Sequence, residues 1–158
     1  MRAAVLTVSD RAAAGVYQDE SGPAAAEILR TSLHVEDILT AIVPDHREEI
    51  EKVLLRWVEV EGVQLVLSSG GTGISPRDVT PQATLNVLDY EVPGLAEVMR
   101  AASLAKTPMA ALSRAVAGVR ERTLIINLPG SPKAVKECLE AILPVLPHAL
   151  SQLEGGGH

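Results

Sequence analysis

Small polar and charged residues gather in one long glycine-rich segment, residues 68–80, which directly follows the aliphatic run 63–67. Its glycines let backbone N–H groups approach an anion closely, while hydroxyls and a guanidinium add further donors. The candidate anion ligands are Ser69, Gly70, Gly71, Thr72, Gly73 and Arg77. This chemistry suits a phosphate group. A tight turn that needs positive φ explains the glycines equally well.

Known phosphate motifs do not describe this segment. No Lys-Ser or Lys-Thr pair follows the glycines, so it is not a P-loop, and its spacing is not that of the dinucleotide fingerprint. A nicotinamide-dependent enzyme is therefore disfavoured. Long loops inside a compact domain are nevertheless usually functional.

Two aspartates could hold a metal ion. Asp78 stands next to Arg77, and Asp45 follows the β-branched run 36–43. Mg²⁺ usually takes one or two carboxylates together with phosphate oxygens and water. Asp78 could equally form an exposed ion pair or cap a helix. Asp45 could instead cap the next helix, because Glu48 lies three residues later in a capping-box arrangement.

Two further loops, 9–22 and 129–133, also follow aliphatic runs. Their candidate ligands are Ser9, Asp10, Arg11, Pro129, Gly130, Ser131 and Lys133. Asp and Ser in the first loop could simply form a turn. The second loop begins a helix, and a helix N-terminus can bind an anion. More often, however, a serine there only caps the helix and a lysine is only solvated.

The elements that position these loops alternate between strands and helices. Strands are expected at 3–8, 36–43 and 63–67, and helices from 23 to about 34, after Asp45, and after Thr80, which is expected to cap its helix. The runs 115–120 and 123–128 predict an antiparallel hairpin. The fold class is α/β, a three-layer sandwich whose mostly parallel sheet includes this late hairpin. Ligands bind such sheets at the carboxyl ends of the strands.

Composition excludes several function classes. The chain has 158 residues, which predicts one domain over 1–154 and a flexible tail at 155–158. A net charge of −6, with one Trp, two Tyr and no Phe, argues against nucleic acid as a partner. No apolar run is long enough to span a membrane, and no signal peptide precedes the first strand, so we expect a cytoplasmic protein. Cys138 and the four scattered histidines show no zinc spacing.

Over nearly its whole length the chain resembles the molybdenum-cofactor biosynthesis family, which includes bacterial molybdopterin adenylyltransferases and the G domains of their plant and animal counterparts. Five segments carry the resemblance in order: TVSDRAAAGVYQDESGP from Thr7, VPD from Val43, SSGGTGISPRDVTPQAT from Ser68, LSRAVAGVR from Leu112 and INLPGSPKAV from Ile126.

The resemblance implies a molybdopterin-binding fold and transfer of AMP from ATP to the terminal phosphate of molybdopterin, with release of pyrophosphate. It also implies Mg²⁺ as cofactor, a homotrimer, and transfer of the product to a molybdenum-insertion protein. By motif, Asp45 and Asp78 would serve catalysis, and residues 70–73 and 129–130 would line the phosphate region. Ser113, in the segment LSR, would lie on the molybdopterin side.

A non-catalytic alternative belongs to the same family. The first segment joins GVYQD, typical of the adenylyltransferases, to DESGP, typical of a sister subgroup. Such a protein would be a molybdopterin-binding carrier or a trimeric scaffold. Substitution of Asp78 distinguishes the two hypotheses, since only the enzyme would lose AMP transfer while staying folded.

Overall fold

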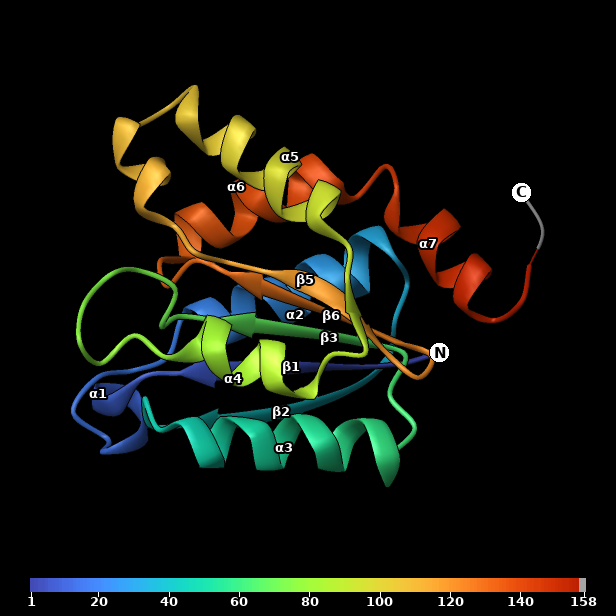
Figure 1. Ribbon diagram of the computed structural model, residues 1–158, viewed down its shortest axis with the longest axis horizontal. Coiled ribbons are helices and arrows are strands. Elements are labelled where there is room, and N and C mark those ends of the chain that lie inside the picture. The colour runs from blue at the N-terminus through green and yellow to red at the C-terminus, as the bar shows by residue number, and fades with distance from the viewer. Residues whose placement is uncertain (157–158) are drawn as a thin grey trace.

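A six-stranded sheet runs through the centre of the computed structural model, which describes residues 1–156 (Figure 1). Its strands are β1 (Arg2–Val8), β2 (Asp37–Val43), β3 (Leu65–Ser69), β4 (Tyr90–Glu91), β5 (Ala117–Arg120) and β6 (Thr123–Leu128). They lie in the order β2-β1-β3-β6-β5-β4. The first four in this order are parallel, whereas β5 and β4 are antiparallel to their neighbours. The mostly parallel sheet and the late hairpin are therefore confirmed.

Helices cover both faces of the sheet (Figure 1). One face packs against α2 (Ser21–Ser32), α5 (Pro93–Leu104), α6 (Pro132–Ile142) and α7 (Leu146–Leu153). The other packs against α3 (Arg47–Glu59) and α4 (Thr80–Val87). Two short helices complete the chain, α1 (Asp10–Ala13) directly after β1 and the 3-10 helix η1 (Pro108–Leu112) beside α5. This is the three-layer sandwich that the alternating pattern predicts.

The central strands are buried on both faces, so their aliphatic side chains contribute to two separate hydrophobic cores. In β1, Ala3 and Val5 face the α2 side, while Ala4 and Leu6 face the α3 side. This alternation follows from the two-residue period of a strand, and parallel strands covered on both faces are apolar throughout. The aliphatic runs of the sequence therefore predict the strands well.

Element boundaries differ from the expectation in several places. The helix expected from 23 to about 34 runs over Ser21–Ser32, and the chain turns after it at His34, which has φ of 55°. The expected loop 9–22 contains α1, whose first turn is capped by Ser9, with Oγ accepting from Ala12 N at 3.1 Å. The short strand β4, which the sequence pattern does not predict, forms the far edge of the sheet.

Neither Asp45, which the sequence leaves open as a helix cap, nor Thr80, which it predicts as one, caps its helix. The N-cap of α3 is His46 and that of α4 is Val79, and neither side chain caps its helix. The Asp45 carboxylate instead accepts from Asp10 N at 2.9 Å. Thr80 is the first residue inside α4, and its N–H donates to Gly71 O at 3.2 Å. Contacts between loops thus override the local capping patterns.

The described part of the chain ends shortly after α7. Within residues 1–156 no helix is long and apolar enough to cross a membrane. The flexible tail predicted at 155–158 includes residues 157–158, which lie outside the described residues.

Candidate active site

The four parallel strands end at the same edge of the sheet, so the loops that follow them meet there. Val8 at the end of β1 pairs with Val43 at the end of β2, and Ser69 of β3 pairs with Leu128 of β6. Ser69 Oγ also donates to Pro129 O at 2.8 Å, linking the loop after β3 to the loop after β6. The three loops singled out in the sequence are thereby brought together.

The glycine loop, residues 70–73, has a backbone that only glycine adopts easily at two positions. Gly70 and Gly71 have φ of 98° and 68°. A Cβ on Gly70 would overlap Val8 O, and one on Gly71 would overlap Thr80 Oγ1. The consecutive amides of residues 71–74 have no acceptor within residues 1–156. The loop is therefore both a tight turn that requires glycine and a set of consecutive N–H donors suited to an anion.

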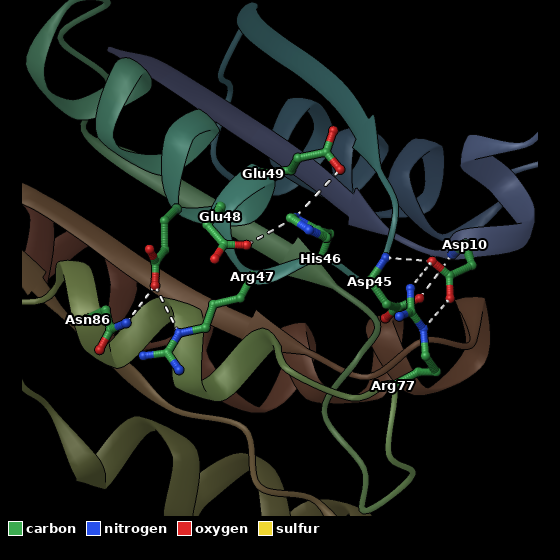
Figure 2. Close-up of polar contacts among 9 residues, drawn as sticks. Asp10, Asp45, His46, Arg47, Glu48, Glu49, Arg77 and Asn86 are labelled. Atoms are coloured by element: carbon green, nitrogen blue, oxygen red, sulfur yellow. Dashed lines mark hydrogen bonds and ion pairs between the residues drawn. The ribbon is translucent and has the colours of Figure 1, made fainter.

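Hydrogen bonds join Asp10, at the start of α1, to Asp45 in the loop after β2 and to Arg77 in the glycine-rich segment (Figure 2). Asp10 N donates to Asp45 Oδ2 and Asp45 N donates to Asp10 Oδ1, both at 2.9 Å. Arg77 donates to both Asp10 carboxylate oxygens, from Nε and from Nη2, again at 2.9 Å. Arg77, which the sequence predicts as a phosphate donor, thus uses two of its five guanidinium N–H groups on Asp10.

The charges in this set shift two carboxyl pKa values in opposite directions. The hydrogen bonds from Arg77 and then from Asp45 N hold the pKa of Asp10 below its usual range. Burial raises the pKa of Asp45, the nearby charges of Asp10 and Asp78 raise it further, and the Asp10 N–H and Arg77 oppose the rise. Asp45 is thus a carboxylate held beside other negative charges, an arrangement that favours a bound cation.

Asp78 lies beside Gly73 of the glycine loop. Its Oδ2 accepts from Ser75 N at 3.0 Å and would lie 2.9 Å from a Cβ on Gly73. Asp45 Oδ1 would lie 3.0 Å from a Cβ on Gly71. The two aspartates, 33 positions apart in sequence, therefore both lie beside one loop. The negative charge of Asp78 helps to raise the pKa of Asp45.

The oxygen atoms around this loop fit Mg²⁺ as a companion of phosphate. Asp45 Oδ1 and Asp78 Oδ1 accept no hydrogen bond within residues 1–156, and the buried Thr80 Oγ1 has no partner there either. The described residues contain no group of three or more His, Cys, Asp or Glu that could hold a metal ion. Two carboxylates suit Mg²⁺, which usually fills its remaining positions with substrate phosphate and water.

A polar cavity of ≈ 220 Å³ opens between these loops. The sequence-predicted residues that line it are Ser9, Asp45, Ser69, Gly70, Gly71, Asp78 and Gly130. Sequence reasoning missed five lining residues, namely Thr7, Val8, Tyr17, Asp19 and Ser21. Asp19 accepts from Thr7 Oγ1 at 2.7 Å and from Gly22 N at 3.1 Å, and Ser21 Oγ donates to Gly130 O at 2.6 Å. An aspartate three residues before a buried glycine was the available signal for this turn.

A second, mostly apolar cavity of ≈ 240 Å³ lies on the other side of the glycine loop. Residues that line it include Thr72, Gly73, Met99, Arg100, Ser113 and Pro129. Arg100 Nη1 donates to Ala115 O at 2.9 Å and to Ser113 O at 3.4 Å. Sequence reasoning found Ser113 through the family resemblance and missed Arg100, since an arginine on an amphipathic helix reads as a solvated side chain.

Other predicted ligands lie outside both cavities. The exposed Arg11 guanidinium sits 5.7 Å from the centre of the Tyr17 ring. Ser131 is confirmed as the N-cap of α6, with Oγ accepting from Ala134 N at 3.2 Å. Lys133 is exposed and makes no hydrogen bond or ion pair within residues 1–156. These three side chains and those of Asp10 and Arg77 do not line the polar cavity.

Comparison with known proteins shows similarity in both sequence and fold. A family model described as "Probable molybdopterin binding domain" matches residues 4–148. The molybdopterin adenylyltransferase of Helicobacter pylori is 45% identical over 152 residues, covering 96% of this chain and 86% of that protein. The enzyme of the same name from Escherichia coli is 46% identical, covering 90% of this chain and 73% of that protein.

Solved structures agree with the sequence matches. The molybdopterin biosynthesis enzyme MoaB from Thermus thermophilus has a TM-score of 0.91 and 56% identity, covering 98% of this chain and 96% of that chain. A structure of MogA has a TM-score of 0.92 and 46% identity, covering 97% of this chain and 99% of that chain. On the family match and these relatives together, the chain belongs to the molybdopterin-binding domain family of molybdenum cofactor biosynthesis.

Proposed function

We propose that this protein is a molybdopterin adenylyltransferase, which transfers AMP from ATP to the terminal phosphate of molybdopterin. In this reaction a molybdopterin phosphate oxygen bonds to the α-phosphorus of ATP, and the bond from that phosphorus to pyrophosphate breaks. Joining two polyanions requires hydrogen-bond donors and cations that offset their repulsion, more than a protein nucleophile.

One observation carries the proposal, namely that two cavities of different chemistry meet at the glycine loop. Gly70 and Gly71 line the polar cavity, whereas Thr72 and Gly73 line the apolar one. A nucleotide phosphate chain suits the polar side, and a flat heterocycle suits the apolar side. The reacting phosphates would then lie between them, against the unpaired loop amides.

Each part of the site has a role that its contacts support. The amides of 71–73 donate to phosphate oxygens and stabilise the charge that develops on the α-phosphate. Ser113 and Arg100 hold the molybdopterin side, because Arg100 is anchored to Ser113 O and still has donors to spare. The carboxylates of Asp45 and Asp78 would hold Mg²⁺ through their unused oxygens. When bound there, Mg²⁺ would neutralise phosphate charge and orient the leaving pyrophosphate.

Three wider features of the family stay proposals for this chain. A homotrimer, delivery of adenylyl-molybdopterin to a molybdenum-insertion protein, and a cytoplasmic location each rest on the resemblance and on the sequence pattern. Size-exclusion chromatography with light scattering measures the first directly, since a trimer has three times the mass of the 16.7 kDa chain.

The experiment that tests the function follows pyrophosphate release from purified protein with ATP, Mg²⁺ and molybdopterin, omitting one component at a time. We expect release only when all three are present. Asp78→Asn should abolish release while leaving the fold intact. Asp37→Asn is the matched control, because Asp37 pairs with Arg2 at the opposite end of β2. Molybdopterin binding without release by wild-type protein would reject the enzyme and support the carrier of the same family.

A further inference from the structure

Arg77 makes a two-point ion pair with an aspartate on another loop. Its Nε and Nη2 each lie 2.9 Å from an Asp10 carboxylate oxygen (Figure 2). Two parallel N–H donors fix the orientation of both groups more tightly than a single contact. The two side chains are 63% and 41% exposed, and exposed ion pairs contribute little to the free energy of unfolding. The pair is therefore expected to act on local geometry.

Asp10, whose orientation Arg77 fixes, in turn fixes the orientation of Asp45. Asp10 Oδ1 accepts both from Arg77 Nη2 and from Asp45 N, so rotating this carboxylate would disturb both hydrogen bonds. Asp10 N in turn holds Asp45 Oδ2 at 2.9 Å. With Oδ2 occupied, the remaining oxygen of Asp45 is the one turned toward Gly71.

We propose that Asp10 and Arg77 are positioning residues, a latch that holds Asp45 with one carboxylate oxygen turned toward the glycine loop. The inference rests on the proposed function, since it deepens the account of that same site. Arg77 then acts through Asp10 and Asp45 and does not bind substrate phosphate. The latch also ties the far end of the glycine-rich segment to the loop after β1.

Steady-state kinetics on single and double variants tests this proposal. Arg77→Met and Asp10→Asn should each lower kcat by about 10²-fold, the effect of misplacing an active-site group by about 1 Å, and leave KM for ATP within about twofold. The double variant should be no slower than either single variant, because both remove the same constraint. Arg77→Lys keeps the charge but not the two-point geometry, so it should remain impaired.

Arg47→Met is the matched control, because Arg47 pairs with Glu51 on the exposed face of α3 at 3.2 Å, away from the glycine loop. Its kcat and KM should equal those of wild type. The latch is overturned if Arg77→Met raises KM for ATP while Asp10→Asn has no effect on kcat, or if Arg77→Lys is fully active. Those results would make Arg77 a phosphate ligand.

Amide hydrogen exchange separates failure of the latch from failure of the proposed function. Arg77→Met and Asp10→Asn should both speed exchange at the hydrogen-bonded amides of Asp45, Ser75 and Asp78, and Arg47→Met should not. Unchanged exchange in either latch variant overturns the proposal. If wild-type protein releases no pyrophosphate, the adenylyltransferase assignment fails, and exchange still decides whether the latch holds the loop.

Discussion

Replacing Gly71 with alanine distinguishes two reasons for a glycine in the glycine loop. Gly71 has φ of 68°, a conformation that costs an alanine about 1–2 kcal/mol. A Cβ there would also overlap Thr80 Oγ1 and lie 3.0 Å from Asp45 Oδ1. Gly15 has a similar φ of 74°, yet a Cβ on it would meet nothing within 4 Å. Gly15→Ala therefore introduces the backbone strain alone, and Gly71→Ala adds the collision.

The structure sets the expected magnitudes. Gly15→Ala should lower the free energy of unfolding by about 1–2 kcal/mol. Gly71→Ala should lower it by about 2–5 kcal/mol, because overpacking a tight site adds about 1–3 kcal/mol. Urea denaturation measures both values. Combining Gly71→Ala with Thr80→Ala removes the overlapping hydroxyl, so the double variant should be more stable than the sum of the single effects.

The same variants separate stability from activity. Gly71→Ala should also slow pyrophosphate release, because the new methyl group displaces Asp45 or the loop amides, whereas Gly15→Ala should not. Equal stability losses for the two alanine variants, or no coupling between Gly71→Ala and Thr80→Ala, would refute the collision. The glycine would then be required only by its backbone conformation.

Three other outcomes are expected. Because the folded pKa of Asp45 is raised from 3.8 by burial, its stabilising effect is complete below pH 3.8 and is lost as pH rises through the folded pKa. Asp45→Asn should thus be at least as stable as wild type at pH 7 in thermal melts without Mg²⁺, yet inactive. Asn127→Ala should lose about 2–4 kcal/mol in urea denaturation, since its buried amide donates to Ser68 Oγ and Thr84 Oγ1, both at 2.9 Å. Burial raises the pKa of the Cys138 thiol, so a thiol reagent should label it only after unfolding.

Sequence patterns predicted the strands better than the helix starts. Runs of Val, Leu and Ala, such as those at 3–8 and 63–67, are stabilised by burial on both faces. A strand covered by helices on both sides provides that burial, so such runs predict strands reliably. A helix start depends on a few side-chain contacts that neighbouring loops can take over. At Asp45 the capping pattern was present, but the carboxylate is bound to Asp10 N in the folded chain.

The latch was beyond sequence reasoning because its members are far apart. Asp10 and Arg77 are separated by 67 positions, and the neighbour of Arg77 in sequence, Asp78, offered a plausible local partner. Choosing between these aspartates requires the order and register of three strands. Ser21 was missed for a related reason, since only the return of β6 beside β3 brings Gly130 to Ser21.

Strand register is therefore the physical basis of the site. Each residue advances a strand by about 3.3 Å, and side chains alternate between faces, so a shift of two residues would move a loop by about 6.6 Å while keeping the core pattern. Such a shift between β1 and β2 would separate Asp10 from Asp45, whose reciprocal bonds are 2.9 Å long. The core pattern alone would tolerate that shift. The hydrogen bonds at the carboxyl edge of the sheet consequently help to specify the register, and the residues proposed to position the phosphates also help to align the strands.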